Sequence, residues 1–529
     1  MTERQGQARV ARAAGLLMAA ILASRILGFI RERAVGDIFG RTQVTDAFFA
    51  AFAVPDLMYY LLVGGALSAA FIPVFTEYLA RGEEEEAWRV ASSFLNLVVL
   101  LLLGFTVLGI LFAPLLAPLV AYKFAGEQLR LLVYLMRIMF PAVFFTALAG
   151  LGMGVLNSYQ HFTLPALGPI VYNIFIILGA YLLGPRIGIV GMALGVVAGA
   201  WSNFALQWLG VWRRAGRYRW QIDLRHPGMQ KMFRLMLPSI VGLSVVQINL
   251  LVNQNLASGL AEGSITALRL ANRLMQLPLG VFAMAISTAI FPTLTRQVAR
   301  GEKENFTATA LAGLRLTLFI TIPSSLGLLA LAEPIVRLLY QTGQFGPEDT
   351  RATAVALMYF ALGLFPQSGV QILTRAFYSL QDTLTPLRVG AATVALNIAL
   401  NLFFLHVTRL GHGGLALAFS LTSFFNLAAL LFLLRRKLGP LGGRRLAAST
   451  ARSLGASLVM ALISSLVARE VGLRVDLASG AGRLLQVGLA IVAGVVVYAA
   501  GVLLLRSEEV KELWRLGLQS RKKRGGGAE

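Results

Sequence analysis

Long apolar runs separated by short polar links dominate the hydrophobic pattern of this chain. A helix needs about 20 apolar residues to cross the hydrocarbon core of a bilayer. The expected fold class is therefore an all-α polytopic membrane protein with fourteen transmembrane helices. The runs that predict these spans, each bounded by charges, Gly or Pro, are residues 13–36, 46–79, 89–119, 128–157, 163–184, 187–212, 229–259, 264–298, 306–332, 350–380, 384–406, 413–434, 446–468 and 481–506.

Composition supports this class. Of the 529 residues, 57% are hydrophobic and only 14% are charged, whereas soluble domains carry about 25% charged residues. The chain has no cysteine, which excludes disulfides, thiolate zinc sites and cysteine nucleophiles. Its histidines form no H-E-x-x-H pattern, so no metal site is expected. These histidines are His161, His226, His406 and His412.

The charge pattern predicts how the chain is oriented. A net charge of +22 could indicate nucleic-acid binding, but the cations cluster at 213–225, 435–452 and 521–524, beside apolar spans. That placement is typical of cytoplasmic loops, so nucleic acid is not an expected partner and both termini are expected in the cytoplasm. The first apolar run follows a basic start and resembles a signal peptide, yet it continues past Arg25. We therefore expect an uncleaved first span.

Two parts of the chain repeat each other. Residues 66–83 align without a gap with residues 285–302, and the two stretches share a proline and an Ala-Arg-Gly-Glu exit. The Ser-x-Gln at 158–160 recurs at 379–381, again about 220 residues later. Because six spans are an even number, the pattern predicts two parallel six-helix repeats. The expected domains are an N-lobe at 1–219, a C-lobe at 220–437, and two C-terminal helices with a basic tail at 438–529.

Two arginines in the first span are candidate functional residues. An arginine at membrane depth is unfavourable by about 2.5–3.5 kcal/mol on insertion scales, and it is tolerated where it faces a cavity or a ligand. Arg25 and Arg31 are six residues apart and diverge by about 120° around a helix, so they can line two walls of one cavity. Glu32 and Asp46 are the local counter-ions.

The second lobe carries a matching set of polar residues. Arg269 and Arg273 share one face of the span at 264–298, beside Asn272, and Asn253 lies in the preceding span. Carboxylates are scarce by comparison. An arginine-rich site should attract a polyanion, because the guanidinium fork matches phosphate oxygens. Contact between helices is an alternative role for Asn253.

Two further arginines, Arg137 and Arg375, have two open interpretations: they line a cavity or they anchor helix ends.

Parallel lobes imply a cleft that holds a substrate and opens alternately to the two sides of the membrane. The last two spans lie outside the repeats and form either an accessory anchor or a lipid-facing groove.

Several motifs resemble one known family. The stretches Ser24-Arg25-Ile26-Leu27-Gly28-Phe29, Thr45-Asp46-Ala47-Phe48-Phe49 and Asn272-Arg273-Leu274-Met275 are similar to those of the MurJ (MviN) lipid II flippases. These belong to the multidrug/oligosaccharidyl-lipid/polysaccharide exporter superfamily, and the resemblance covers essentially the whole chain. The chain departs from some members at three positions that are charged there, namely Tyr59, Gly64 and Gln276.

The resemblance implies a flippase that moves the undecaprenyl-pyrophosphate-linked precursor lipid II from the inner to the outer leaflet of the bacterial inner membrane. No bond is made or broken, so no enzyme activity and no cofactor are expected. The energy would come from an ion or from the membrane potential, between which the sequence does not choose. The expected partners are lipid II, the bilayer and the cell-wall synthesis machinery.

In this interpretation two groups of residues have roles. The pyrophosphate is held by Arg25, Arg31, Arg273, Asn272 and Asn253. A second group, Asp46 and Glu32, forms ion pairs that set a gate.

Three alternatives remain at this point. The first is another polysaccharide-lipid or multidrug exporter of the same superfamily, although drug–cation exchange would favour carboxylates. The second is a membrane-embedded glycosyltransferase, which would need catalytic carboxylates near a polar loop. The third is a scaffold of the cell-wall machinery, for which substitutions in the cavity would have no effect.

Overall fold

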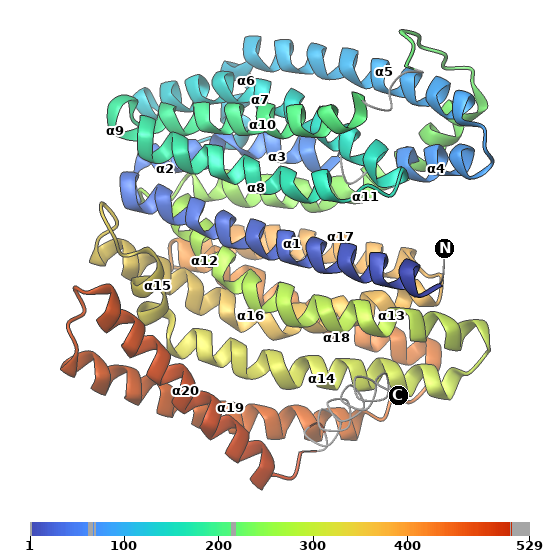
Figure 1. Cartoon of the computed structure of the whole chain (residues 1–529). Helices are drawn as coiled ribbons and strands as arrows, with labels where there is room; N and C mark the ends of the chain where they lie inside the picture. Colours follow the sequence, from blue (N-terminus) through green and yellow to red (C-terminus); the bar gives the residue numbers. More distant parts are fainter. Residues whose placement is uncertain (1–2, 62–66, 68–69, 213–217, 508, 510–529) are drawn as a thin grey trace. The chain divides into compact units, whose positions relative to one another are not determined.

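The computed structural model describes residues 3–61, 67, 70–212, 218–507 and 509. Every element in these ranges is a helix (Figure 1). The elements are α1 (Glu3–Phe39), α2 (Gln43–Ala51), α3 (Ala53–Tyr59), α4 (Ile72–Ala80), α5 (Glu84–Leu111), α6 (Ala113–Val120), α7 (Gly126–Ser158), α8 (Thr163–Leu178), η2 (Gly179–Leu183), α9 (Gly184–Ile187), α10 (Ile189–Trp212), α11 (Pro227–Ala257), α12 (Ser264–Pro278), η4 (Leu279–Ala283), α13 (Met284–Ala299), α14 (Lys303–Ala330), α15 (Ala332–Tyr340), α16 (Pro347–Ser379), α17 (Leu384–Val407), α18 (His412–Leu438), α19 (Gly443–Arg474) and α20 (Gly480–Leu504).

The chain forms two compact units. The boundary lies between Thr266 and Ala267, inside α12, and residues 342–345 join the first unit. The lobes expected from the repeat have their boundary at 219/220 instead. Spatial contacts and internal duplication are different criteria, so the lobe boundaries stay a prediction.

In the first unit α10 packs against α7 and α8, and α8 also packs against α1. Small residues allow this close approach: a Cβ on Gly195 would lie 2.8 Å from the carbonyl oxygen of Phe175, and one on Gly199 would lie 2.7 Å from that of Tyr172. Real Cβ atoms do not approach this closely, so only glycine fits at these positions. The small-residue ladder on α10 is therefore a helix-packing surface.

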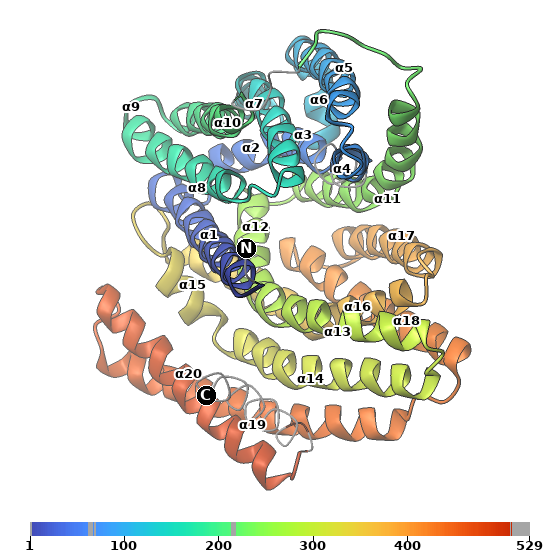
Figure 2. The same ribbon diagram turned by 45° about the vertical axis from the view of Figure 1, so that its right-hand side comes forward.

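In the second unit α16 lies between α14 and α18, and α19 pairs with α20 while contacting α14 (Figure 2). Buried apolar side chains, among them Leu314 and Phe377, form the core. The outer faces of α19 and α20 carry exposed large hydrophobic side chains such as Leu458 and Val492. An apolar exterior of this kind fits a lipid environment.

Two pairs of helices that occupy corresponding places along the chain have equal lengths. Both α5 and α14 have 28 residues, and both α7 and α16 have 33. Just after the end of α7 and of α16 lies a glutamine in the left-handed region, Gln160 and Gln381 respectively, both with φ 58°. This conformation is uncommon for a residue other than glycine. Gly82 and Gly301 likewise share a positive φ, at 78° and 71°.

Eleven helices in the described ranges are long and apolar enough to cross a membrane. Eleven of the fourteen expected spans are matched by these helices, and the total of fourteen stays a prediction. The expected spans at 13–36 and 229–259 coincide with α1 and α11, which are not among the eleven. Both helices carry polar side chains that lower their hydropathy. The span at 46–79 is divided into α2, α3 and α4, and part of it, including Gly64, lies outside the described residues.

Candidate functional site

Arg31 and Glu32 form an ion pair on α1. Arg31 Nη2 lies 2.7 Å from Glu32 Oε1, and the two side chains are 18% and 3% exposed. A carboxylate as buried as that of Glu32 requires a partner, because an isolated buried charge is strongly unfavourable. Arg25, two turns earlier, is exposed. The two arginines therefore differ in exposure on α1, and their lining of two walls of one cavity stays a prediction.

Asp46 holds the beginning of α12. Its Oδ2 accepts a hydrogen bond from the Gly263 amide at 2.8 Å, and its Oδ1 accepts bonds from the Thr266 amide at 2.8 Å and the Thr266 hydroxyl at 2.7 Å. Asp46 is only 3% exposed. A carboxylate is well placed here, since the first amides of a helix lack intrahelical acceptors and carry partial positive charge.

The local fold of α2 directs Asp46 toward these donors. Thr42 and Thr45 form a reciprocal capping box at the start of α2, with the Thr42 amide donating to Thr45 Oγ1 at 2.9 Å. Asp46 follows directly in the first turn. Its pairing with an arginine in a gate stays a prediction, because its hydrogen bonds come from the start of α12.

The second-unit candidates lie on α12. Arg273 and Asn272 are both half-buried, and Gln276 is exposed. The helix is amphipathic, and Leu270 and Leu274 are buried on its apolar face. Since these residues belong to the second unit, their position opposite α1 stays a prediction.

The polar residues of α11 divide into two groups. Asn255 Nδ2 donates to the carbonyls of Pro118 and Leu119, at 3.1 and 2.8 Å, and so ties α11 to the end of α6. Gln254, which sequence reasoning did not single out, donates to the Ala50 carbonyl at 3.3 Å. Asn253 instead donates to the Asn249 carbonyl within its own helix, at 2.9 Å. Contacts between helices thus explain Asn255 and Gln254, whereas the substrate role of Asn253 stays a prediction.

The two arginines with open interpretations have separate surroundings. Arg137 is exposed, and its Nε donates to the Ile110 carbonyl at 3.3 Å, close to the end of α5. This contact favours the anchoring interpretation. Arg375 is half-buried, with its guanidinium 5.4 Å from the centre of the Phe291 ring.

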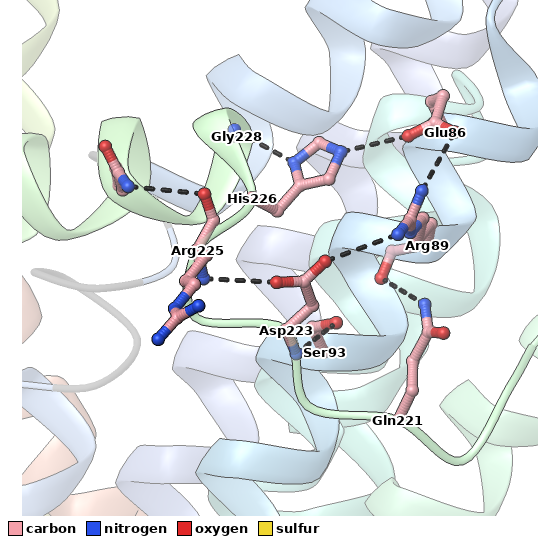
Figure 3. Close-up of polar contacts among 9 residues, drawn as sticks. Glu86, Arg89, Ser93, Gln221, Asp223, Arg225, His226 and Gly228 are labelled. Carbon is pink, nitrogen blue, oxygen red and sulfur yellow. Dashed lines mark hydrogen bonds and ion pairs between the residues drawn. The ribbon is translucent and has the colours of Figure 1, made fainter.

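The link before α11 is fastened to α5 by a row of polar contacts (Figure 3). His226 Nε2 lies 2.9 Å from a carboxylate oxygen of Glu86, and Arg89 lies 3.4 Å from Asp223. The amide of Asp223 donates to Ser93 Oγ at 3.1 Å. The α5 residues recur every three or four positions, so they share one face of the helix.

Sequence reasoning missed this row, although the signal was present. The acidic run at 83–86 and the basic link at 213–225 have opposite charges in the sequence, but only the fold shows that the described part of this link, from 218 onward, lies against α5. His226 also accepts a hydrogen bond from the Gly228 amide through Nδ1 at 3.0 Å, which caps α11. Across the described part of the chain no group of three or more His, Asp or Glu side chains could hold a metal ion.

Comparisons with known proteins agree on one family. A family model described as lipid II flippase MurJ matches residues 35–473. A probable lipid II flippase MurJ of Vibrio cholerae serotype O1 is 33% identical over 431 residues, which cover 79% of this chain and 81% of that relative. A lipid II flippase MurJ of Burkholderia cenocepacia is 31% identical over 434 residues, 79% of this chain and 82% of that relative.

Solved structures give the same result. A lipid II flippase MurJ in an inward closed conformation superposes with a TM-score of 0.78 at 28% identity, covering 94% of this chain and 99% of that one. An inward-facing multidrug resistance MATE family transporter superposes with a TM-score of 0.67 at 15% identity, covering 79% of this chain and 96% of that one. The second similarity shows a shared fold only.

Proposed function

Because this chain belongs to the lipid II flippase MurJ family, we propose that its intramembrane arginines hold the pyrophosphate of lipid II while the lipid crosses the bilayer. The chain is a lipid II flippase, that is, a transporter and not an enzyme. The glycosyltransferase alternative is thereby excluded.

The proposed substrate site consists of Arg25, Arg31 and Arg273, with Asn272 and Asn253 as neutral donors. Arginine presents several N–H donors in a planar fork, which suits the oxygens of a pyrophosphate. The Arg31 and Glu32 pair supports this role. Glu32 binds one edge of the guanidinium and fixes its orientation, while the remaining donors can bind an anion. In the same proposal Asp46 and Glu32 act in a gate, with Asp46 holding the first turn of α12.

Alternating access of two six-helix repeats is the proposed mechanism, with α19 and α20 outside the repeats as the path for the polyprenyl tail. The equal lengths of α5 and α14, and of α7 and α16, support the repeat. The matching left-handed residues Gln160 and Gln381 support it further. A strained conformation at the same point of two sequences is hard to explain by shared hydrophobicity alone.

We further propose that the protein resides in the bacterial inner membrane with both termini in the cytoplasm. The basic segments that follow α10 and α18 support this orientation under the positive-inside rule. Net transport also requires a source of energy, which we propose to be an ion gradient or the membrane potential. The cell-wall synthesis machinery is the proposed protein partner.

The single observation that carries the site is Arg31: a largely buried arginine on α1 that lies 2.7 Å from the carboxylate of Glu32. The test is depletion of the native flippase in cells, with complementation by Arg31→Ala or Arg273→Ala. We expect lipid II to accumulate on the inner leaflet with both variants. The matched control is Arg137→Ala, which removes an exposed arginine and should support normal export. Normal export with Arg31→Ala and Arg273→Ala would refute the assignment.

A further inference from the structure

A basic cavity lies in the second unit where α14, α18 and α19 meet, and it has a volume of about 1070 Å³. A pocket of about 480 Å³ adjoins it and shares part of its lining, including Arg315 and Arg445. The name basic cavity is used below for both together. Its cationic lining residues are Lys303, Arg315, Arg435, Arg444, Arg445 and Arg452.

One of the residues that line the cavity is a glutamate, Glu509, whose carboxylate is held by hydrogen bonds. Glu509 is 1% exposed. Its Oε1 accepts a hydrogen bond from Ser449 Oγ at 2.6 Å, and its Oε2 accepts one from Ser507 Oγ at 2.8 Å. Arg315 Nε lies 3.9 Å from the same Oε1. Burial opposes the charge of this carboxyl, but its hydrogen bonds and the nearby charge of Arg315 prevail and lower the pKa of Glu509. The cavity therefore stabilises an anionic oxygen group.

Cations exceed carboxylates in this lining. The described lining residues include six cations but only two carboxylates, those of Glu304 and Glu509. Like charges gathered at this density repel one another, so the excess favours a bound anion. Arg444, Arg445 and Arg452 are exposed and can reorient toward it.

The position of the cavity along the helices indicates the kind of anion. Arg435 lies in the last turn of α18, and Arg444 and Arg445 lie in the first turn of α19. Both helices are long and apolar enough to cross a membrane, so the arginines lie at the depth of lipid headgroups. Leu431 and Phe432 add an apolar wall, and Phe432 is 60% exposed. A soluble anion would gain nothing from that wall, whereas an acyl chain would.

We propose that the basic cavity binds the phosphate headgroup of an anionic phospholipid, whose acyl chains run along Leu431 and Phe432 into the adjoining leaflet. Basic pockets between transmembrane helices suit such headgroups, because charge and apolar contact act together. Glu509 occupies part of the same cavity and competes with the headgroup for the arginines. The site is separate from the residues of the proposed substrate site.

The experiment is native mass spectrometry of the purified full chain titrated with phosphatidylglycerol, and with phosphatidylcholine as the neutral lipid. We expect tighter binding of phosphatidylglycerol. The double variant Arg444→Ala/Arg445→Ala should weaken it about 30-fold, as two arginines lost near a surface imply. Both side chains are exposed, so the variant should fold normally.

The matched control is Arg469→Ala/Arg474→Ala, which removes two exposed arginines from the opposite end of α19. It should bind phosphatidylglycerol within about twofold of the original chain. An equal loss in both double variants would overturn the proposal, because it would show a general effect of net charge. Equal binding of the two lipids would overturn it too.

Two further arms separate the sources of phosphate and test the role of Glu509. Inorganic phosphate at millimolar concentration should not displace phosphatidylglycerol, and full displacement would indicate a site for a soluble anion instead. Glu509→Gln removes the competing charge and should tighten phosphatidylglycerol binding about fivefold. Unchanged or weaker binding in that variant would contradict a shared site.

Discussion

Arginines are used differently in two regions of this chain. On α1, Arg31 is largely buried and lies against one almost fully buried carboxylate, that of Glu32. In the basic cavity, by contrast, arginines such as Arg444 and Arg445 are exposed and outnumber the carboxylates. A buried pair is coupled to folding, since each charge requires the other. Exposed cations contribute little to the fold and remain available to a ligand. Stability measurements can therefore separate these two uses.

The largest effect is expected at the buried pair. Arg31→Ala removes the cation that lies 2.7 Å from the buried carboxylate of Glu32, and the free energy of unfolding should fall by about 3 kcal/mol. Adding Glu32→Gln removes the negative charge as well, so the double variant should recover most of that loss. Thermal unfolding of the detergent-solubilised protein measures both effects. A double variant as unstable as the single one would show that charge pairing is not what stabilises this part of α1.

The next largest effect is expected at Asp46. Asp46→Ala removes the acceptor of three hydrogen bonds from Gly263 and Thr266. The loss should be about 2 kcal/mol, because hydrogen bonds to charged groups are stronger than neutral ones. Thr266→Val removes only the hydroxyl and should lose about 1 kcal/mol. Unfolding midpoints of the two variants show which one loses more stability. A larger loss for Thr266→Val than for Asp46→Ala would contradict this description of Asp46.

A smaller, pH-dependent effect is expected at Lys437, in the same last turn of α18 as Arg435. Lys437 donates to Asp382 at 2.7 Å, and this bond is the main cause that lowers the pKa of Asp382 to about 2 from an ordinary value near 3.8. Because the folded pKa is the lower one, this stabilisation is present above about pH 4 and is lost as the pH falls toward 2.

Replacing Lys437 tests that pH dependence. Lys437→Met should raise the pKa of Asp382 and weaken the acid dependence of stability. At neutral pH the loss should be below about 1 kcal/mol, because Lys437 is 44% exposed and exposed ion pairs contribute little. Unfolding temperatures between about pH 2 and pH 7 measure the difference. If the original chain and Lys437→Met lose stability equally in acid, Lys437 is not the cause of the lowered pKa of Asp382.

The smallest effect on stability is expected in the basic cavity. Arg444→Ala/Arg445→Ala should change the free energy of unfolding by less than about 0.5 kcal/mol, as is usual for exposed positions. The measurement is made in neutral detergent without anionic lipid. A loss as large as that of Arg31→Ala would remove the contrast between the two regions.

The sequence predicted the general class well and the contacts poorly. Hydrophobic periodicity is local, so runs such as 84–111 could be identified without knowing their neighbours. The motifs around Arg25 and Arg273 were sufficient to identify the family, which the comparisons confirm. The number of fourteen helices stays a prediction. The helices α1 and α11 combine the length of a span with polar side chains, and part of the span at 46–79 lies outside the described residues.

The partners of the site residues could be predicted only where they are neighbours along the chain. Glu32 follows Arg31 directly, so proximity in the sequence suggested that pair and the structure confirms it. Asp46 is different, because its donors lie more than 200 residues away at Gly263 and Thr266. The pairing of Asp46 with an arginine stays a prediction, and the structure adds backbone amides at the start of a helix as its donors. Amides have no sequence signature, so only the fold could identify them.

The most direct test of the central claim is lipid II export by Arg31→Ala/Glu32→Gln in cells depleted of the native flippase. This double variant is charge-balanced, so its abundance should match that of the original chain. The control is Arg137→Ala, which removes an exposed arginine outside the proposed site. If the Arg31 and Glu32 pair holds the pyrophosphate, lipid II accumulates on the inner leaflet with the double variant but not with the control. Normal export by a fully abundant double variant would contradict the claim.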